Sequence, residues 1–414
     1  MKARGITSHI LAALIDTPVV FVNGPRQAGK TTLARSIAAE GFGGSKDVSY
    51  LTFDKITTEA AASSDPEAFV SSFQGPVVLD EAQRVPELFR AIKLRVDADR
   101  RPGLFLLTGS ANVLTVPGIS ESLAGRMEIV TLHPFSQGEF RGRPEHFVDA
   151  CFHDALPAVI RANESEDYPA LVHAGGYPEV LERATHDRRR DWFDAYISTV
   201  LQRDIRDLAN IEGLTELPNI LSLVAARSGG LVNYAELSRT SGLAASTLKR
   251  YLSLLSTTFL IRELPAWSRN PSKRFVRSPK FYLNDSGLAG HLLGSDPAAA
   301  VFTNRTWGPL LETFVLAEVT RQAGWSQSRP GVYHYRTSNG SEVDVVMESS
   351  RREVVGIEVK ASASVVSGDF NGLRSLRDAA GGQFRRGFVL YSGNELVHFE
   401  RDLAAVPIRS LWEW

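Results

Sequence analysis

Short apolar runs alternate with helical patterns over the first third of the chain. The runs are rich in Val, Leu and Phe, and several of them end in Gly or in charged residues. Continuous apolar strands separated by helices are typical of a parallel sheet that is buried on both faces. We therefore expect strands at 19–22, 50–53, 77–79, 104–108 and 127–132, with helices at 30–39 and 87–99.

The pattern changes twice further along the chain. Residues 150–265 have apolar positions at helical spacing, which predicts a long helix at 192–207, a helix-turn-helix at 234–255 and a strand at 259–264. The last part predicts helices at 309–322 and 369–378, with strands at 332–336, 342–347, 354–360 and 387–391. Polar, Gly- and Pro-containing residues at 138–145 mark the first boundary.

These patterns predict an α/β protein of four parts. We expect an α/β domain with a parallel sheet at 1–140, a helical linker at 141–230, a winged-helix-like domain at 231–285 and a second α/β domain at 286–414. A chain of 414 residues is long enough for several domains. The apolar start, at 1–22, is interrupted by Asp16 and Pro18 and leads into the first motif, so we interpret it as part of the fold.

Composition excludes some classes of protein. The net charge of −1 gives no overall attraction to nucleic acid, so any such contact must come from local basic patches. A single cysteine, Cys151, excludes an internal disulfide and a cysteine-based zinc cluster, and it fits a cytoplasmic setting. We find no apolar run long enough to span a membrane.

The first motif follows the strand at 19–22 and fits the pattern G-x-x-x-x-G-K-[ST]. Its glycines let backbone N–H groups surround phosphates, and the helix that begins after it adds partial positive charge. Lys30 is expected to reach the β- and γ-phosphates of ATP, and Thr31 to bind Mg²⁺. The expected ATP-binding residues are Gly24, Pro25, Arg26, Gln27, Ala28, Gly29, Lys30, Thr31 and Thr32.

A second motif ends the strand at 77–79 with Asp80 and Glu81. Beside a phosphate loop, this pair is expected to supply a magnesium ligand, Asp80, and a residue that polarises the attacking water, Glu81. The strand at 104–108 leads into Ser110 and Asn112, either of which is a candidate to orient that water. Turn formation is the alternative role for both residues.

Arg126 follows in the string SLAGR. It is a candidate arginine finger, acting in its own chain or in a neighbouring subunit, which would make the protein a homo-oligomer. A solvated arginine in an ion pair is an equally good interpretation.

Several strings together resemble a known family: GPRQAGKTTLAR, VVLDEAQ, LLTGSAN, SLAGR, HPFSQGE, GGYPE and LQRDIRDL. They resemble the AAA-type ATPases of the domain-of-unknown-function 4143 group, over nearly the whole chain. The resemblance implies a C-terminal domain related to restriction endonucleases. It implies little about substrate.

A second constellation lies in the C-terminal part. Asp344 and Glu358 lie on two expected neighbouring strands, and Lys360 faces the same side as Glu358. Carboxylates beside a lysine suit a divalent ion and a water. With Glu312 on the preceding helix, the arrangement resembles the PD-(D/E)xK nuclease core. By that resemblance Asp344 and Glu358 bind Mg²⁺ or Mn²⁺, Lys360 assists the nucleophile and Glu312 completes the site. No PD dipeptide is present, and a degenerate fold used for binding is the alternative.

Basic residues in the middle predict a DNA contact. Lys249 and Arg250 lie on the second helix of the helix-turn-helix. A run without acidic residues follows, made of Arg269, Lys273, Arg274, Arg277 and Lys280. A module that only packs domains together is the alternative.

Two hypotheses remain at this point. One is an ATP-driven enzyme that binds and cuts DNA. The other is a nucleotide-controlled switch or assembly factor whose C-terminal module does not cut.

Overall fold

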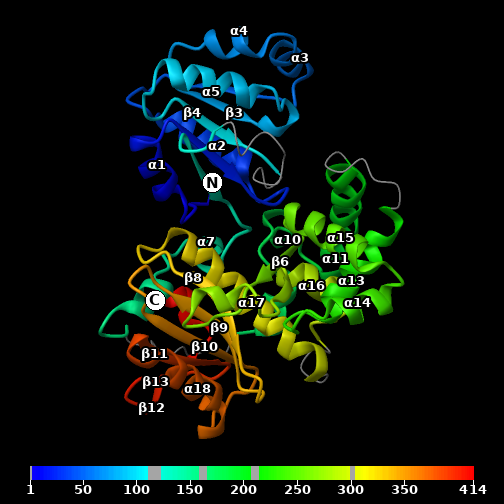
Figure 1. Ribbon diagram of the computed structural model, residues 1–414, viewed down its shortest axis with the longest axis vertical. Coiled ribbons are helices and arrows are strands. Elements are labelled where there is room, and N and C mark those ends of the chain that lie inside the picture. Colours follow the sequence, from blue (N-terminus) through cyan, green and yellow to red (C-terminus); the bar gives the residue numbers. More distant parts are fainter. Residues whose placement is uncertain (1, 111–122, 158–165, 207–213, 299–303) are drawn as a thin grey trace.

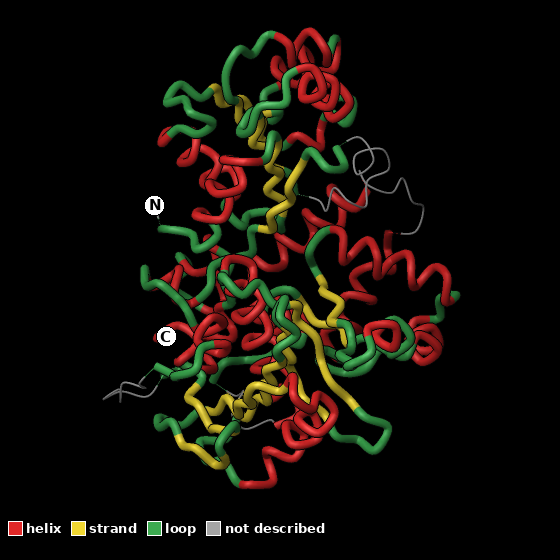
Figure 2. The backbone as a smooth tube through the Cα atoms, turned by 60° about the vertical axis from the view of Figure 1, so that its left-hand side comes forward, coloured by secondary structure: helices red, strands yellow, loops and turns green. Residues whose placement is uncertain are grey.

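The computed structural model describes residues 2–110, 123–157, 166–206, 214–298 and 304–414. One sheet belongs to the N-terminal part and a larger sheet to the C-terminal part, at opposite ends of the molecule (Figure 1). Helices of the middle of the chain lie beside and between the two sheets (Figure 1). Figure 2 shows the strands of the two sheets in yellow toward the two ends of the molecule, with helices in red around them.

The N-terminal sheet is parallel, as the apolar runs predict. Its strand order is β2-β3-β4-β1-β5. Alternate residues of β1 enter two apolar clusters, one on each face, so the sheet is buried on both sides. The strands are β1 (Val19–Asn23), β2 (Ser49–Thr52), β3 (Val77–Asp80), β4 (Phe105–Thr108) and β5 (Met127–Thr131). The helices are α1 (Thr7–Asp16), α2 (Lys30–Glu40), α3 (Ile56–Ser64), α4 (Pro66–Ser71) and α5 (Leu88–Ala98).

The C-terminal sheet is mixed, with the order β12-β13-β11-β10-β9-β8. A long helix, α17 (Asn304–Trp325), packs on one face, and α18 (Asn371–Ala380) packs on the other. The expected hairpin is confirmed, because β9 and β10 are antiparallel neighbours. The strands are β8 (Gly331–Arg336), β9 (Glu342–Glu348), β10 (Val354–Lys360), β11 (Phe384–Tyr391), β12 (Val397–Glu400) and β13 (Leu403–Pro407); the last two were not predicted.

The middle of the chain is helical, with one hairpin. The expected helix-turn-helix is present as α14 (Tyr234–Ser241) and α15 (Ala245–Thr257), and the strands β6 (Ile261–Leu264) and β7 (Lys280–Leu283) form a hairpin after it. The long helix predicted at 192–207 is instead α11 (His186–Thr199) with a π-helical turn, Val200–Asp204, after it. The other helices are α7 (Gln137–Arg141), α8 (Phe147–Phe152), α9 (Tyr168–Ala174), α10 (Pro178–Leu181), α13 (Leu217–Ala226) and α16 (Ser286–Leu292).

The three expected domains after residue 140 share one hydrophobic core. A continuous apolar cluster runs from Phe147 to Trp414 and includes helices of the middle, the hairpin and one face of the C-terminal sheet. The backbone N–H of His146 donates to the carbonyl oxygen of Trp414, so the supposed linker begins inside this core. The boundaries expected at 230 and 285 do not separate cores, because short amphipathic helices each bury only one face and α17 covers several of them.

A buried polar junction joins the N-terminal domain to this body. Arg4 pairs with Glu139 of α7 at 3.1 Å, and the N–H of Phe135 donates to the carbonyl of Gly176. On the other side of the junction, Arg321 of α17 pairs with Asp285 at 3.4 Å. The strings HPFSQGE and GGYPE, far apart in sequence, therefore meet at one place.

Candidate functional site

The loop after β1 leads directly into α2 and has the geometry of a phosphate-binding loop. Gly24 and Gly29 have φ angles of 142° and 96°, and a Cβ at Gly24 would lie 2.1 Å from the carbonyl oxygen of Leu132. Lys30 Nζ donates to the carbonyls of Gly24 at 3.0 Å and Pro25 at 2.9 Å, which places its charge against the loop. No described side chain caps the start of α2, so its N–H groups remain directed at this loop.

Asp80 is held at the carboxyl end of β3 by three hydroxyl groups. Thr31 Oγ1 lies 3.0 Å from Asp80 Oδ2, Tyr50 donates to the same oxygen at 2.7 Å, and Thr108 donates to Asp80 Oδ1 at 2.5 Å. Hydrogen bonds of this kind orient a carboxylate. A threonine hydroxyl and a carboxylate, both hard oxygen donors, thus face each other beside the loop, and this donor pair fits Mg²⁺.

Glu81 directly follows, in a left-handed backbone conformation with φ of 59°. Its backbone N–H donates to Thr108 Oγ1 at 3.0 Å, and its carboxylate accepts from Gln83 Nε2 at 2.6 Å. The same Gln83 nitrogen lies 3.2 Å from Ser110 Oγ. The structure therefore links Glu81 and Ser110 through Gln83, while Asn112 lies outside the described residues.

Arg126 does not reach the phosphate loop of its own chain. It directly precedes β5, and its carbonyl accepts from the N–H of Val19, the first residue of β1. The phosphate loop lies at the other end of β1, about 16 Å away at about 3.3 Å per residue. The side chain of Arg126 pairs with Asp97 at 2.5 Å. The expectation of a finger acting in its own chain is wrong for this structure.

The C-terminal carboxylates converge. Asp344 Oδ2 accepts from the N–H of Val359 at 2.9 Å, next to Glu358 on β10. Lys360 Nζ lies 3.6 Å from Glu358 Oε1 and 3.7 Å from Asp369 Oδ1. Glu312 of α17 is close enough for its charge to raise the pKa of Asp344. The structure therefore brings these four side chains into one cluster.

Lys280, which the sequence assigned to a DNA contact, occupies the same cluster. Lys280 Nζ lies 3.1 Å from Glu312 Oε1, 2.6 Å from Glu342 Oε1 and 4.0 Å from Asp344 Oδ1. Its side chain is 1% exposed. Tyr282 also donates to Glu312 Oε1. Lys280 therefore cannot serve as the surface DNA contact that the basic run predicted.

The part of the cluster around Glu312 and Glu342 does not fit a divalent ion. A magnesium or manganese ion needs several oxygens at about 2.0–2.2 Å, whereas the ammonium of Lys280 already contacts the oxygens of Glu312 and Glu342. Within the described residues, no group of three or more His, Cys, Asp or Glu side chains is placed to hold a metal. The structure does not support the metal site expected at Asp344 and Glu358.

Burial makes two of these carboxyl groups weaker acids than exposed ones. It raises the pKa of Asp344, with a further contribution from the charges of Glu312 and Glu358. Burial also raises the pKa of Glu358 to about 7, although Lys360 opposes the shift. Both groups keep their protons to a higher pH than an exposed carboxyl does.

The remaining basic residues divide into exposed and engaged ones. Arg274 contacts Glu348 and stacks over Tyr333, with its guanidinium 4.8 Å from the ring centre, so it is committed to the fold. Arg269 and Lys273 are exposed in the loop between β6 and β7, and Lys249 and Arg250 are exposed on α15. Arg277 is exposed and donates to the carbonyl of Arg336 at 3.3 Å.

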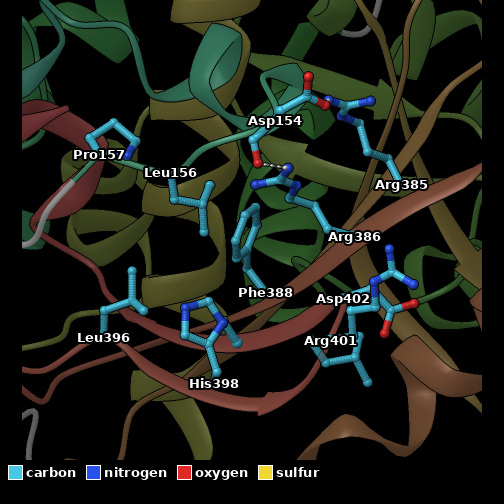
Figure 3. Close-up of a pocket in the computed structure, with 12 residues that line it drawn as sticks. Asp154, Leu156, Pro157, Arg385, Arg386, Phe388, Leu396, His398, Arg401 and Asp402 are labelled. Carbon is cyan, nitrogen blue, oxygen red and sulfur yellow. Dashed lines mark hydrogen bonds and ion pairs between the residues drawn. The ribbon is translucent and has the colours of Figure 1, made fainter.

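A separate hollow of about 390 Å³ lies at the edge of the C-terminal sheet, near β12 and β13. Figure 3 shows Arg385 and Arg386 on its wall with Asp154. Arg385 pairs with Asp154 at 2.8 Å and Arg386 donates to the carbonyls of His153 and Asp154, so both arginines are engaged by the protein. We assign this hollow no role, because neither the phosphate-loop residues nor the carboxylate cluster lines it.

Sequence reasoning missed several residues of the two sites. Thr108 was detectable, since the last residue of a parallel strand lies at the edge where phosphates bind. Arg126 was misjudged by the same rule, because a residue directly before a parallel strand lies at the opposite edge. Gln83 ends the string VVLDEAQ, but that string did not point to its role. No local motif places four other residues in these sites: Tyr50, Lys280, Tyr282 and Glu342.

The fold and the first site define a P-loop ATPase with an AAA-type domain. A family model described as an AAA domain matches residues 16–141, and two domains of unknown function, DUF8612 and DUF4143, match residues 165–299 and 307–411. Two curated relatives, uncharacterized protein Rv2008c of Mycobacterium tuberculosis and uncharacterized protein Mb2031c of Mycobacterium bovis, are each 32% identical over 409 residues. The match covers 98% of this chain and 84% of each relative, so the chain belongs to their family.

Solved structures give weaker likenesses. AMPPCP-bound DnaA from Aquifex aeolicus is 15% identical, covering 62% of this chain and 89% of that chain, with a TM-score of 0.31. PCH-2 of C. elegans is 15% identical, covering 60% of this chain and 67% of that chain, with a TM-score of 0.24. At these scores the likenesses carry no functional argument. Among the described helices, none is long and apolar enough to cross a membrane.

Proposed function

We propose that this protein hydrolyses ATP with Mg²⁺ at the loop from Gly24 to Thr32. The observation that carries the proposal is the Thr31–Asp80 pair, 3.0 Å apart, beside the glycine loop and at the start of α2. The loop and the helix end would hold the phosphates, and Lys30 would neutralise their charge. Thr31 and Asp80 would hold Mg²⁺, which when bound neutralises charge on the β- and γ-phosphates.

Glu81 is the residue that we assign to the attacking water. The water oxygen forms a bond to the γ-phosphorus, the bond to the β–γ bridging oxygen breaks, and Glu81 takes the proton. Gln83 supports this role because it already orients the Glu81 carboxylate, and Ser110 lies next to the same amide.

The test separates binding from hydrolysis. Lys30→Ala is expected to lose ATP binding in a fluorescent-nucleotide titration. Glu81→Gln is expected to keep binding and to lower kcat for phosphate release roughly a hundredfold or more. Glu87→Gln, an exposed acid a few residues further on, is the matched control and should behave as wild type. Wild-type turnover by Glu81→Gln would remove Glu81 from the mechanism, and no turnover by wild type would refute the ATPase.

We also propose that the nucleotide controls the C-terminal body, as a switch does. Arg4 supports this, because its guanidinium donates to the carbonyl of Ala28 in the phosphate loop at 2.8 Å and to Glu139 of α7 at 3.1 Å. Metal-dependent DNA cleavage, which the sequence suggested, is not part of this proposal, because Lys280 lies among the carboxylates.

Nucleic acid is the partner that we propose for the exposed loop between β6 and β7. Phe275 is 90% exposed and Val276 is 82% exposed, between the basic residues Lys273 and Arg277. An exposed aromatic ring suits stacking on a base, and flanking cations suit phosphates. This geometry favours single-stranded DNA or an unpaired end.

Anisotropy titrations with labelled single-stranded and duplex DNA test the loop. Lys273→Ala with Arg277→Ala is expected to weaken binding and to reduce the salt slope by about 1 per lost phosphate contact. Phe275→Ala is expected to weaken single-strand binding roughly fivefold or more. Arg188→Ala with Arg190→Ala, on the exposed face of α11, is the charge-matched control. Equal losses in the control would assign binding to net charge and not to the loop.

A further inference from the structure

Lys280 is a buried cation that comes from outside the sheet whose carboxylates it contacts. It begins β7, which pairs with β6 in the hairpin after the helix-turn-helix. Its partners Glu342 and Asp344 lie on β9, and Glu312 lies on α17. Two elements of the C-terminal module, β9 and α17, therefore contact one side chain of the hairpin.

The contact is too costly to be incidental. Burying an ammonium group away from water is unfavourable by several kcal/mol unless opposite charges and hydrogen bonds compensate it. Here two carboxylates lie within 3.1 Å of the nitrogen and a third lies at 4.0 Å. The carboxylates in turn need a cation, because four that are buried or half-buried would otherwise repel one another: Glu312, Glu342, Asp344 and Glu358.

We propose that Lys280 is the permanent counter-cation of this cluster, in the place that a divalent ion would need. A metal ion at about 2.0–2.6 Å from the oxygens of Glu312 and Glu342 would overlap with an ammonium that is 3.1 Å and 2.6 Å from them. The C-terminal module then binds no metal here and performs no metal-dependent cleavage of phosphodiesters.

The same ion pairs fix the hairpin to the sheet. Next to them, the N–H of Trp267 donates to the carbonyl of His334 on β8 at 2.6 Å, and the N–H of His334 donates to the carbonyl of Pro265 at 3.0 Å. The segment after β6 thus extends the edge of the C-terminal sheet. Lys280 completes the attachment from the other strand of the hairpin, so the hairpin and the C-terminal module are held together.

The first experiment measures Mn²⁺ binding to full-length protein without nucleotide, by electron paramagnetic resonance of the free ion. Asp80→Asn in every variant removes the metal ligand beside the phosphate loop. We expect no saturable Mn²⁺ binding with Lys280 present. We expect Lys280→Met to gain one Mn²⁺ per chain, and Lys280→Met with Asp344→Asn to lose it again. Lys280→Arg keeps the positive charge, and we expect this variant to bind no Mn²⁺.

The proposal would be overturned if protein that keeps Lys280 bound one Mn²⁺ and if Asp344→Asn abolished that binding. The metal would then displace the lysine. A second measurement, the Tm of thermal unfolding, tests the proposal even if Lys280→Met is unstable. We expect this variant to lose more than about 5 °C in Tm and to recover part of the loss with Mn²⁺. An unchanged Tm, together with no Mn²⁺ binding, would show that the cluster needs no cation and would also overturn the proposal.

Discussion

Thr108 Oγ1 donates a hydrogen bond of 2.5 Å to Asp80 Oδ1, across the gap between β4 and β3. The same hydroxyl accepts from the backbone N–H of Glu81 at 3.0 Å. One buried threonine therefore holds both acidic residues at the carboxyl edge of the sheet. Because β4 lies between β1 and β3, Thr108 ends the strand that separates the strand of the phosphate loop from the strand of these acids.

Replacing Thr108 by Val keeps its shape and removes the hydroxyl. Asp80 then loses one of its three hydroxyl partners and the N–H of Glu81 loses its acceptor, so both acids shift. We expect kcat for ATP hydrolysis to fall roughly ten- to a hundredfold, with a smaller change in KM. Thr108→Ser, which restores the hydroxyl, is expected to recover most of the rate. Equal rates for Val and Ser would show that the hydroxyl plays no part.

Arg126→Ala tests whether this arginine acts in a neighbouring subunit. Arg126 lies at the edge of the sheet opposite the phosphate loop, and it pairs with a solvent-exposed Asp97. We expect the steady-state ATPase rate to change less than about twofold, with little effect on Tm. Asp97→Asn, which breaks the same pair, is the control. A large loss of rate in Arg126→Ala alone, in an ATPase whose specific activity rises with protein concentration, would instead assign Arg126 to a neighbouring subunit.

The parts of the molecule that could be predicted are those with local signals. The phosphate loop is a contiguous string between a strand and a helix, so its residues carry their own geometry. Asp344 and Glu358 could be paired because a short turn between two strands fixes their register. The polar ends of β3 and β4 follow from the common direction of parallel strands.

The position of Lys280 could not be predicted in the same way. It belongs by composition to an exposed basic run, and only the pairing of β7 with β6 buries it. Its partners lie on α17 and β9, far along the chain, so no spacing rule connects them. The shared core from Phe147 to Trp414 was missed for the same reason, because amphipathic patterns give the apolar face of each helix but not its neighbour.

Glu358→Gln tests the electrostatics of the cluster. The pKa of Glu358 is raised from 4.5 to about 7 by burial, so the folded protein binds this proton more tightly than the unfolded chain. The free energy of unfolding therefore falls as pH rises from about 4.5 to 7. The groups that set this shift are Lys360 on its own strand, Glu312 on α17, Lys280 on β7, and Glu342 and the opposite Asp344 on β9.

The variant removes the titration, since Gln resembles the protonated acid. At pH 8 we expect the free energy of unfolding to rise by about 1–3 kcal/mol relative to wild type, and at pH 4 we expect no difference. Urea unfolding at the two pH values gives the measurement. Glu182→Gln, an exposed acid of the same body, is the control. A stabilisation that is equal at both pH values would have another cause than this carboxyl.

Arg4 is the residue that we expect to carry the nucleotide signal to the C-terminal body. It is buried, stacks 4.5 Å over the ring of Phe135, and bonds to Ala28, His133 and Glu139. A phosphate bound in the loop would move or fix the carbonyl of Ala28, and the rigid guanidinium would pass that change to α7. Arg4→Lys keeps the charge but cannot hold all three partners.

Hydrogen exchange with and without a non-hydrolysable ATP analogue measures this coupling. In wild type we expect the analogue to slow exchange in the phosphate loop and in α7. In Arg4→Lys we expect protection of the loop to remain and protection of α7 to fall severalfold. Lys46→Ala, which removes an exposed cation of the N-terminal domain, is expected to behave as wild type. Unchanged coupling in Arg4→Lys would show that the signal passes elsewhere in the junction, and absence of any response in α7 of wild type would contradict the switch.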